Sequence, residues 1–214
     1  MNNLLKECTA LDLCANGINL SVLAYCDEIL ILSPSEGHCQ ILLKICEDFS
    51  KNWKIDFNTN KSAALTLHKA KNNSLPNFIL NNANIPNVQN VEYLGLPIGN
   101  SEFVAEFLEQ KWKKVEKSFY SLYGLGCKLK MSSPEVIGFL YKQFCQSTFR
   151  YYLDLLFIGE KKISDIDIRQ NLLLKRAFGI KKFARFRALL EAVNIETIEQ
   201  MYLKDKISFI KQIR

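Results

Sequence analysis

The stretch LAYCDEILIL, residues 23–32, sets two acidic residues between two apolar segments. The surrounding residues 20–33 are mostly β-branched, aliphatic or aromatic, a composition typical of strands. We therefore predict two short strands joined at Cys26 and Asp27, which places Asp27 and Glu28 at the tip of a β-hairpin. Two interpretations of these acids are open: they form a metal-binding catalytic pair, or they are the polar tip of an ordinary turn.

A helix is expected directly after the hairpin. Pro34 and Ser35 end the second strand, and Ser35 can cap a following helix. Apolar residues then recur at steps of three and four residues, at Ile41, Leu42, Ile45, Phe49 and Trp53. This pattern predicts an amphipathic helix that packs on a sheet.

Between this helix and residue 100, strand signals alternate with turn signals. Strands are predicted at 63–67, at 78–80, around Ile85 and at 91–99, the last of them ended by Gly99. From Ser101 onward a helical period replaces the strand period. Apolar residues of this part share one helical stripe, at Phe103, Phe107, Trp112, Val115, Phe119 and Leu122.

Helices are predicted to dominate the rest of the chain. Ser133 and Pro134 mark a helix start, and further helices are predicted at 163–178, 186–193 and 198–213. The sequence thus predicts an α+β fold. A small antiparallel sheet with one packed helix is followed by an all-helical part, with the boundary near Asn100.

Charge is distributed unevenly along the 214 residues. Residues 1–50 hold two lysines and seven acidic residues, a net charge of −5, whereas residues 51–214 hold 26 basic and 15 acidic residues, a net charge of +11. An acidic beginning and a basic body suit a protein that holds a metal with one part and a polyanion with the other. Solvated basic helices would give the same composition.

Several classes of protein do not fit this sequence. No apolar run approaches the roughly 20 residues that span a bilayer, and the first ten residues lack the pattern of a signal peptide. We therefore predict an intracellular protein of nucleus or cytoplasm, without a membrane partner. The seven cysteines do not have zinc-site spacing, so we expect reduced, mostly buried thiols.

The order of these segments resembles the second half of a reverse transcriptase palm, of the kind carried by non-LTR retrotransposons. Three stretches carry the resemblance, and they lie in the family's order. Tyr25, Cys26, Asp27 and Glu28 occupy the places of Tyr-x-Asp-Asp; Asn58, Lys61 and Ser62 match Asn-x-x-Lys-(Ser/Thr); Tyr93, Leu94 and Gly95 resemble the primer-grip turn. By this resemblance, residues 1–100 are a partial palm, residues 101–160 are thumb-like helices, and residues 161–214 are a helical connection region.

The resemblance implies RNA-directed DNA polymerase chemistry with RNA and DNA, as template and primer, for partners. Such a site uses Mg²⁺ (or Mn²⁺), as two ions about 4 Å apart held by carboxylates. It implies Asp27 as a direct metal ligand and Glu28 as its partner. It places Lys61 near the phosphates of the nucleotide, although a surface lysine in a turn is equally open. Tyr25 would pack on the primer terminus or on the core, and Tyr93 and Gly95 would lie near the primer.

The sequence also departs from the family. A working palm takes a third carboxylate from an earlier strand, and here only 24 residues precede Tyr25. Asp12 lies too close in sequence to serve, and Glu28 stands where the family has a second Asp. We therefore expect a truncated reverse transcriptase-like protein that is inactive as a lone chain. An incomplete sheet would leave an unpaired edge for self-association, and a second chain could supply the missing strand.

A second hypothesis is a nucleic-acid-binding module without catalysis. Basic residues interleave with aromatic ones in two stretches, as expected for contacts to phosphates and bases. The first stretch has Lys111, Lys113, Lys114, Lys117, Lys128 and Lys130 among Trp112, Phe119, Tyr120 and Tyr123; the second has Lys181, Lys182, Arg185 and Arg187 around Phe183 and Phe186. The alternative is that the aromatic residues belong to the core and the lysines to a solvated face.

Overall fold

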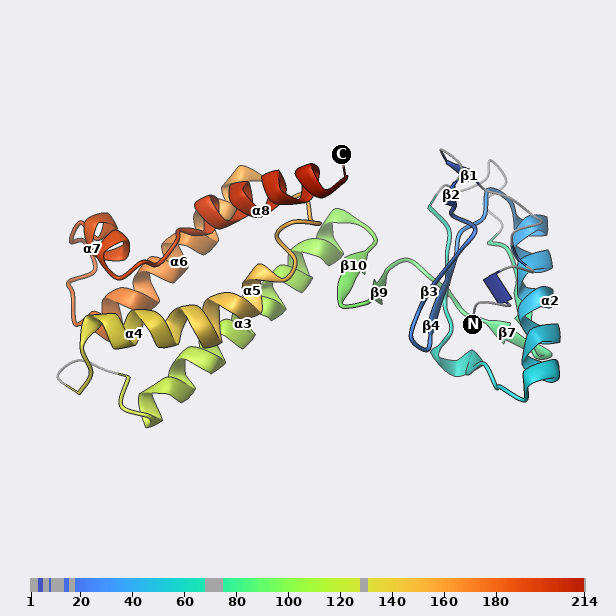
Figure 1. Cartoon of the computed structure of the whole chain (residues 1–214), viewed down its shortest axis with the longest axis horizontal. Coiled ribbons are helices and arrows are strands. Elements are labelled where there is room, and N and C mark those ends of the chain that lie inside the picture. The colour runs from blue at the N-terminus through green and yellow to red at the C-terminus, as the bar shows by residue number, and fades with distance from the viewer. Residues whose placement is uncertain are drawn as a thin grey trace. The chain divides into compact units, whose positions relative to one another are not determined.

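A computed structural model describes residues 4, 5, 8, 14, 15, 18–67, 75–127 and 131–213. The chain divides into two compact units, residues 1–100 and 101–214. Short strands and one long helix make up the first unit, and the described part of the second unit is helical (Figure 1). This confirms the α+β class that the sequence predicts. Among the described residues, no helix combines the length and the apolar character needed to cross a membrane.

The predicted hairpin is present as strands β3 (Val22–Tyr25) and β4 (Glu28–Ile31). The strands pair antiparallel, with Val22 opposite Ile31 and Tyr25 opposite Glu28, so that Cys26 and Asp27 form a two-residue loop. Because side chains alternate along a strand, Val22 and Ile31 share one face of the hairpin. Val22 is buried on this face, whereas Leu23 and Tyr25 on the other face are exposed.

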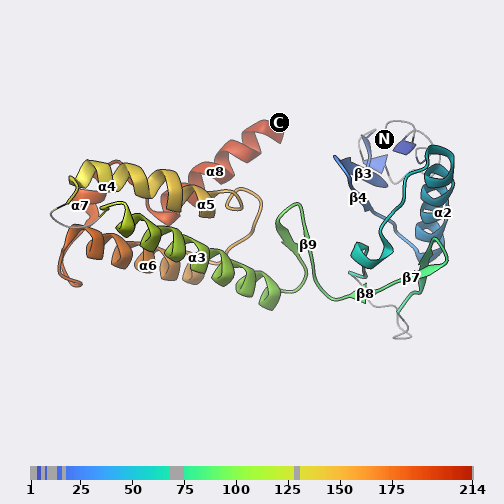
Figure 2. The ribbon, with the colours of Figure 1, turned by 90° about the horizontal axis from the view of Figure 1, so that it is seen from below.

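Helix α2 (Glu36–Trp53) begins where the sequence predicts it. The Ser35 hydroxyl accepts a hydrogen bond from the His38 N–H at 3.3 Å, which satisfies one of the free donors of the first turn. The helix ends at Lys54, whose φ of 53° stops the helical path. Figure 2 shows α2 along one side of β3 and β4.

The buried face of α2 differs in part from the predicted one. Leu42, Phe49 and Cys46 pack with Val22 in one cluster, and Leu43 packs with a second group of strands. Ile41 and Trp53, predicted on the packed face, are 50% and 55% exposed. The reason is that the two neighbouring groups of strands cover a different sector of the helix from the one that the periodicity alone indicated.

The remaining strands of the first unit form further short pairs. Their bounds are β1 (Cys14–Ala15) with β2 (Ile18–Asn19), β5 (Ala64–Leu65) with β8 (Asn87–Val88), and β6 (Phe78–Leu80) with β7 (Ala83–Ile85). The β5–β8 pair is parallel and the other pairs are antiparallel. The sequence predicted one small antiparallel sheet, and the described residues instead form five two-stranded sheets.

Strand β6 is fastened to α2 by one side chain. The Gln40 amide donates to the Ile79 carbonyl at 2.9 Å and accepts from the Ile79 N–H at 3.1 Å, so it takes the place of a neighbouring strand. Phe78 and Leu80 on either side of Ile79 are buried with Leu43. Side chain–backbone hydrogen bonds and apolar contacts therefore hold β6 against the same turn of α2.

The segment 91–99 is a hairpin and not the single strand predicted. Strand β9 (Val91–Tyr93) pairs with β10 (Leu96–Ile98) across the turn residues Leu94 and Gly95, which have φ values of 49° and 76°. Positive φ at both central residues is the pattern of a type I′ turn, whose twist matches that of paired strands. The residue pattern alone indicated one strand because leucine is an unusual residue at such a turn position, whereas the resemblance to a primer-grip turn did place a turn at Tyr93, Leu94 and Gly95.

The second unit consists of helices in its described part. Their bounds are α3 (Ser101–Gly124), α4 (Pro134–Tyr141), the π-helical turn η2 (Lys142–Gln146), α5 (Ser147–Arg150), α6 (Glu160–Phe178), α7 (Arg187–Ala192) and α8 (Ile198–Ile213). The predicted helices are confirmed, as is the Ser133 cap, whose hydroxyl accepts from the Val136 N–H at 3.4 Å. Trp112 and Phe119 are 2% and 1% exposed and belong to the core.

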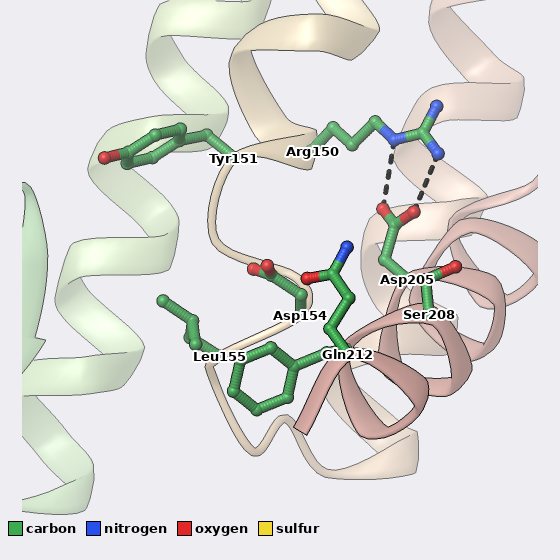
Figure 3. Close-up of a pocket in the computed structure, with 8 residues that line it drawn as sticks. Arg150, Tyr151, Asp154, Leu155, Asp205, Ser208 and Gln212 are labelled. Carbon is green, nitrogen blue, oxygen red and sulfur yellow. Dashed lines mark hydrogen bonds and ion pairs between the residues drawn. The ribbon is translucent and has the colours of Figure 1, made fainter. Parts of the chain in front are cut away.

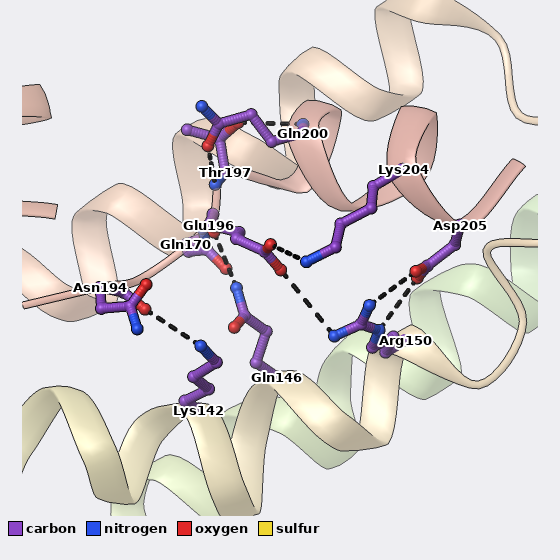
Figure 4. Close-up of polar contacts among 10 residues, drawn as sticks. All are labelled: Lys142, Gln146, Arg150, Gln170, Asn194, Glu196, Thr197, Gln200, Lys204 and Asp205. Atoms are coloured by element: carbon purple, nitrogen blue, oxygen red, sulfur yellow. Dashed lines mark hydrogen bonds and ion pairs between the residues drawn. The ribbon is translucent and has the colours of Figure 1, made fainter. Parts of the chain in front are cut away.

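A polar network fixes the start of α8 against the other helices (Figure 4). Gln146 and Gln170 both donate to the Glu196 carbonyl, at 2.7 and 3.1 Å. Arg150 binds both carboxylate oxygens of Asp205, at 3.1 and 2.7 Å. These contacts satisfy buried amide groups that would otherwise destabilise the packed helices.

An ion cluster joins α3 to α6. Glu109 of α3 accepts from Arg169 at 2.8 Å and also pairs with Lys162. The hydrogen bonds from Arg169 and Lys162 lower the pKa of Glu109 to about 2. Because an unfolded glutamate titrates near 4.3, this cluster stabilises the fold above that pH and loses its effect as the pH falls toward 2.

We predict that Glu109→Gln lowers the free energy of unfolding at pH 7 by about 1 kcal/mol, a value reduced because the groups are partly exposed and screened. The deficit should shrink between about pH 4.3 and 2. Urea unfolding across this range measures both effects. Glu106→Gln, an exposed glutamate one turn earlier, is the matched control, and an equal loss in both variants would contradict the prediction.

Candidate functional site

The tip of the β3–β4 hairpin presents its side chains to solvent. Cys26 has a φ of 53° whereas Asp27 has no positive φ, the sign pattern of a type II′ turn. Cys26, Asp27 and Glu28 are all exposed. Among the described residues, the Asp27 carboxylate has no hydrogen-bond or ion-pair partner. A free carboxylate therefore stands on a tight and conformationally restricted turn.

Tyr25 is 62% exposed. Of the two roles open for it from the sequence, packing on the core is thus excluded. Tyr25 lies directly opposite Glu28 in the hairpin register, and opposed residues of an antiparallel pair share a face of the sheet. The phenol ring and the Glu28 carboxylate therefore lie on the same face.

The hairpin carboxylates fit a magnesium ion in part. Carboxylate oxygens are the ligands that Mg²⁺ prefers, and one or two of them suffice when water and phosphate oxygens complete the shell. Within the described ranges, no group of three His, Cys, Asp or Glu side chains could hold a metal. The described residues thus fit one ion that arrives with phosphate ligands, and they do not supply the ligands for two.

The structure brings Tyr93 near the hairpin acids. Partial burial raises the pKa of Tyr93, and the negative charge of Glu28 raises it further. This places the β9 hydroxyl within electrostatic reach of the carboxylate on β4, although the two motifs lie far apart in sequence. Gly95 follows in the adjoining turn. One residue of each of these two predicted motifs therefore interacts electrostatically with the other.

Lys61 lies at the end of a short 3₁₀ turn, η1 (Thr59–Lys61). The Asn58 side chain accepts from the Asn60 N–H at 3.1 Å, and the Ser62 hydroxyl donates to the Asn58 carbonyl at 3.0 Å. These contacts give Asn58 and Ser62 a role in forming the turn. Lys61 is exposed and makes no ion pair within the part of the chain that is described, so its nearness to a nucleotide stays a prediction.

The predicted basic residues of α3 have different surroundings. Lys113, Lys114 and Lys117 are exposed. Lys111 is 8% exposed, and its ammonium group lies 4.4 Å from the Phe107 ring centroid and 4.8 Å from that of Tyr152. Lys111 thus makes buried cation–π contacts and does not offer its charge to a ligand. Lys128 and Lys130 lie outside the described residues.

The second basic stretch lies between α6 and α7. Lys181, Lys182, Arg185 and Arg187 are all exposed. Phe186 is 7% exposed and belongs to the core, whereas Phe183 is 93% exposed. The core interpretation of the aromatic residues therefore holds for Trp112, Phe119 and Phe186 and fails for Phe183.

A contact that the sequence did not reveal joins the two basic stretches. Arg176, near the end of α6, donates to the Tyr120 hydroxyl of α3 at 2.8 Å. Tyr120 in turn stacks on Tyr123, with ring centroids 5.9 Å apart. Both helices end at the same end of the helical unit (Figure 1). The contact thus joins the last part of α3 to the end of α6, the helix that leads into the second basic stretch.

A hollow of about 360 Å³, lined by both apolar and polar side chains, lies between the residues after α5 and the last turns of α8. Figure 3 shows the Asp154 carboxylate and the Gln212 side chain at this hollow, with the Arg150–Asp205 pair at its edge. The Asp154 Oδ1 atom is buried without a hydrogen-bond partner among the described residues. The only signal in the sequence was one acid within the apolar run YYLDLLFI, residues 151–158.

Comparison with protein families gives a match to residues 1–98, which fit the family described as Reverse transcriptase (RNA-dependent DNA polymerase). This range nearly coincides with the first unit and contains the hairpin acids and the β9–β10 turn. Searches of the curated proteins and of the solved structures gave no match.

The nearness of Glu28 and Tyr93 can be tested directly. We predict that Glu28→Gln lowers the pKa of Tyr93, because the negative charge that disfavours the tyrosinate is removed. Titration of ¹³Cζ-labelled tyrosine followed by NMR measures this shift. Asp27→Asn is the control and should leave the Tyr93 pKa in place. An unchanged Tyr93 pKa in the Glu28→Gln variant would contradict an electrostatic interaction between the two residues.

Proposed function

Because residues 1–98 carry a reverse transcriptase domain, we propose that the β3–β4 hairpin is the metal-binding hairpin of an RNA-directed DNA polymerase palm, of non-LTR retrotransposon origin. Asp27 is the direct metal ligand, and Glu28 is its partner. The observation that carries this proposal is the free Asp27 carboxylate on a tight turn, with Glu28 and Tyr93 beside it. The partners are RNA and DNA, as template and primer. The proposed location is the nucleus or the cytoplasm, where such partners are found.

Each residue of the hairpin has a part in this proposal. The type II′ turn fixes the direction of Asp27, because a tightly paired two-residue loop has little conformational freedom. Tyr25 on the exposed face is available to a primer terminus. Tyr93 at the end of β9 and Gly95 in the β9–β10 turn hold the primer strand near the acids. Lys61 neutralises phosphate charge of the nucleotide.

Mg²⁺ or Mn²⁺, when bound, would polarise phosphate oxygens and lower the pKa of an attacking hydroxyl. The chain's own contribution is a pair of exposed carboxyl side chains at the tip of the hairpin. Glu28 has one methylene more than aspartate, so its oxygens reach farther from the strand than those of Asp27. The two side chains would therefore reach a bound ion from different distances along the hairpin backbone.

We further propose that the 214-residue chain does not extend a primer by itself. Two carboxylates hold a pair of ions poorly, and most of the barrier reduction in such sites comes from that pair.

Metal binding and synthesis give separate tests. We predict that Mn²⁺ broadens the backbone NMR signals around Asp27, and that Asp27→Asn weakens this binding about tenfold or more. Asp56→Asn, an exposed aspartate of the same unit, is the matched control. Primer extension on an RNA template with Mn²⁺ should give no product with any of the three chains. Binding equal in both variants would contradict the assignment of Asp27.

Self-association is the route by which this chain could gain a third carboxylate. The β3–β4 sheet has two strands in the described part of the chain, and its uncovered face includes Leu23, 40% exposed, and Tyr25. Such edges and faces favour pairing with a second copy. Extension that rises with the square of the chain concentration, and is lost in Asp27→Asn, would support a shared site and contradict the proposed inactivity.

A second candidate function is nucleic-acid binding by the basic helical unit, without catalysis. The contact between Arg176 and Tyr120 favours it, because this contact joins the helix that carries Lys113 and Lys117 to the helix that leads into the second basic stretch. Lys113 and Lys117 lie one turn apart on α3 and in line with Tyr120, so they can follow a phosphate backbone. Cations held along such a line release counterions from nucleic acid on binding.

We predict that the double variant Lys113→Glu and Lys117→Glu weakens binding to a fluorescein-labelled oligonucleotide and makes the plot of log affinity against log salt less steep by roughly 1.4, for two phosphate contacts. Lys44→Glu, at an exposed lysine of α2, is the control. Fluorescence anisotropy at several salt concentrations measures the slope. Weak, salt-independent binding by the unaltered chain would exclude this function.

A further inference from the structure

The connection between α6 and α7 keeps a large apolar side chain on the surface. Phe183 is 93% exposed, whereas Phe186, three residues later, is 7% exposed and packs against Phe178 with ring centroids 5.8 Å apart. Phe186 therefore anchors this segment in the core. Phe183 contributes almost nothing to the core, so its position calls for another explanation.

The backbone around Phe183 is held in place. Gly179 ends α6 with a φ of 65°, and the Ile180 N–H donates to the Lys175 carbonyl at 2.9 Å. The Lys175 ammonium donates to the Lys182 carbonyl at 2.7 Å. A further turn is closed by the Ala184 N–H on the Lys181 carbonyl at 3.0 Å. Phe183 is thus displayed on a fastened loop, which lowers the entropy lost when a ligand binds.

The charges around Phe183 all have one sign. Residues 179–188 contain Lys181, Lys182, Arg185 and Arg187 and no acidic residue. The Lys182 ammonium lies 5.7 Å from the Phe183 ring centroid. Arg187 pairs with Glu191 at 3.7 Å, but both side chains are largely exposed, so this pair is weak. An exposed ring surrounded by cations is the combination that contacts bases and phosphates together.

We propose that this loop binds single-stranded nucleic acid, with an unpaired base stacked on Phe183 and the adjacent phosphates on Lys181, Lys182 and Arg185. The inference rests on the second candidate function and specifies its substrate class. Every base offers a flat face to an aromatic ring, so binding is tolerant of sequence. A base inside a duplex is already stacked on both sides and cannot use this ring.

Nucleic acid fits this surface better than an acidic peptide does. An acidic peptide would use the cations and leave the ring uncovered. A single strand offers both phosphates and bases, and this loop offers cations on both sides of one exposed ring in the sequence. Polyglutamate, which carries charge without bases, therefore serves as the competing ligand in the test.

The experiment compares Phe183→Ala with Phe157→Ala. Phe157 is the matched control, because it is 91% exposed and has the Lys206 ammonium 4.3 Å from its ring centroid. The probe is a fluorescein-labelled single-stranded oligonucleotide of twelve thymidines, followed by anisotropy. We expect Phe183→Ala to weaken binding about tenfold without changing the salt slope, Phe183→Trp to retain it, and Phe157→Ala to bind as the unaltered chain does.

Three results would overturn the inference. The first is an equal loss of affinity in Phe183→Ala and Phe157→Ala, and the second is an equal effect of Phe183→Ala on the affinity for a duplex of the same length. The third is displacement of the oligonucleotide by polyglutamate at equal charge. Loss of binding in the Lys113 and Lys117 double variant, with Phe183→Ala unaffected, would reject the inference and leave the second candidate function in place. No binding by the unaltered chain would reject both.

Discussion

The first unit depends on the burial of helix α2 against two separate groups of strands. Leu42, Cys46 and Phe49 pack with Val22 of the hairpin, and Leu43 packs with Phe78, Leu80 and Ile85. An isolated two-stranded hairpin is marginal in water, so neither group of strands would hold its geometry without this helix. The direction of Asp27 therefore depends on apolar contacts at the other end of its own strands. Helix α2 therefore holds the strands that carry both acids.

Local signals explain what the sequence predicted correctly. The hairpin, the Ser35 cap and the helix starts were predictable because each depends on residues within a few positions of one another. The exposure of Ile41, the burial of Lys111 and the contact of Arg176 with Tyr120 were not, because each depends on a distant element. Lys111 is the clearest case: its charge is held by the rings of Phe107 and Tyr152, and periodicity carries no information about such a partner. The electrostatic effect of Glu28 on the pKa of Tyr93 was not predictable either, because the two residues lie far apart in sequence.

The exposed aromatic residues of the two units differ in kind. Tyr25 stands on a strand, opposite a carboxylate, where its ring lies next to a negative group. Phe183 stands on a loop among cations, with Lys182 near its ring. A nucleotide phosphate would be repelled by the first surface unless a metal ion intervened, and attracted by the second without one. The same kind of ligand therefore requires a metal at the hairpin and none at the loop.

Within the helical unit, some basic side chains have acidic partners and others have none among the described residues. Three acids neutralise the cations in one part of it: Glu109 binds Lys162 and Arg169, Asp205 binds Arg150, and Glu196 binds Lys204. Lys113, Lys117, Lys181, Lys182 and Arg185 have no acidic partner within 4.0 Å among the described residues. Ion pairing thus neutralises cations where the helices pack, and it leaves Lys113 and Lys117 of α3 and the cations that follow α6 without an acidic partner among the described residues. Because paired charges attract a polyanion weakly and free charges attract it strongly, the internal salt bridges also determine where on this unit a nucleic acid would bind.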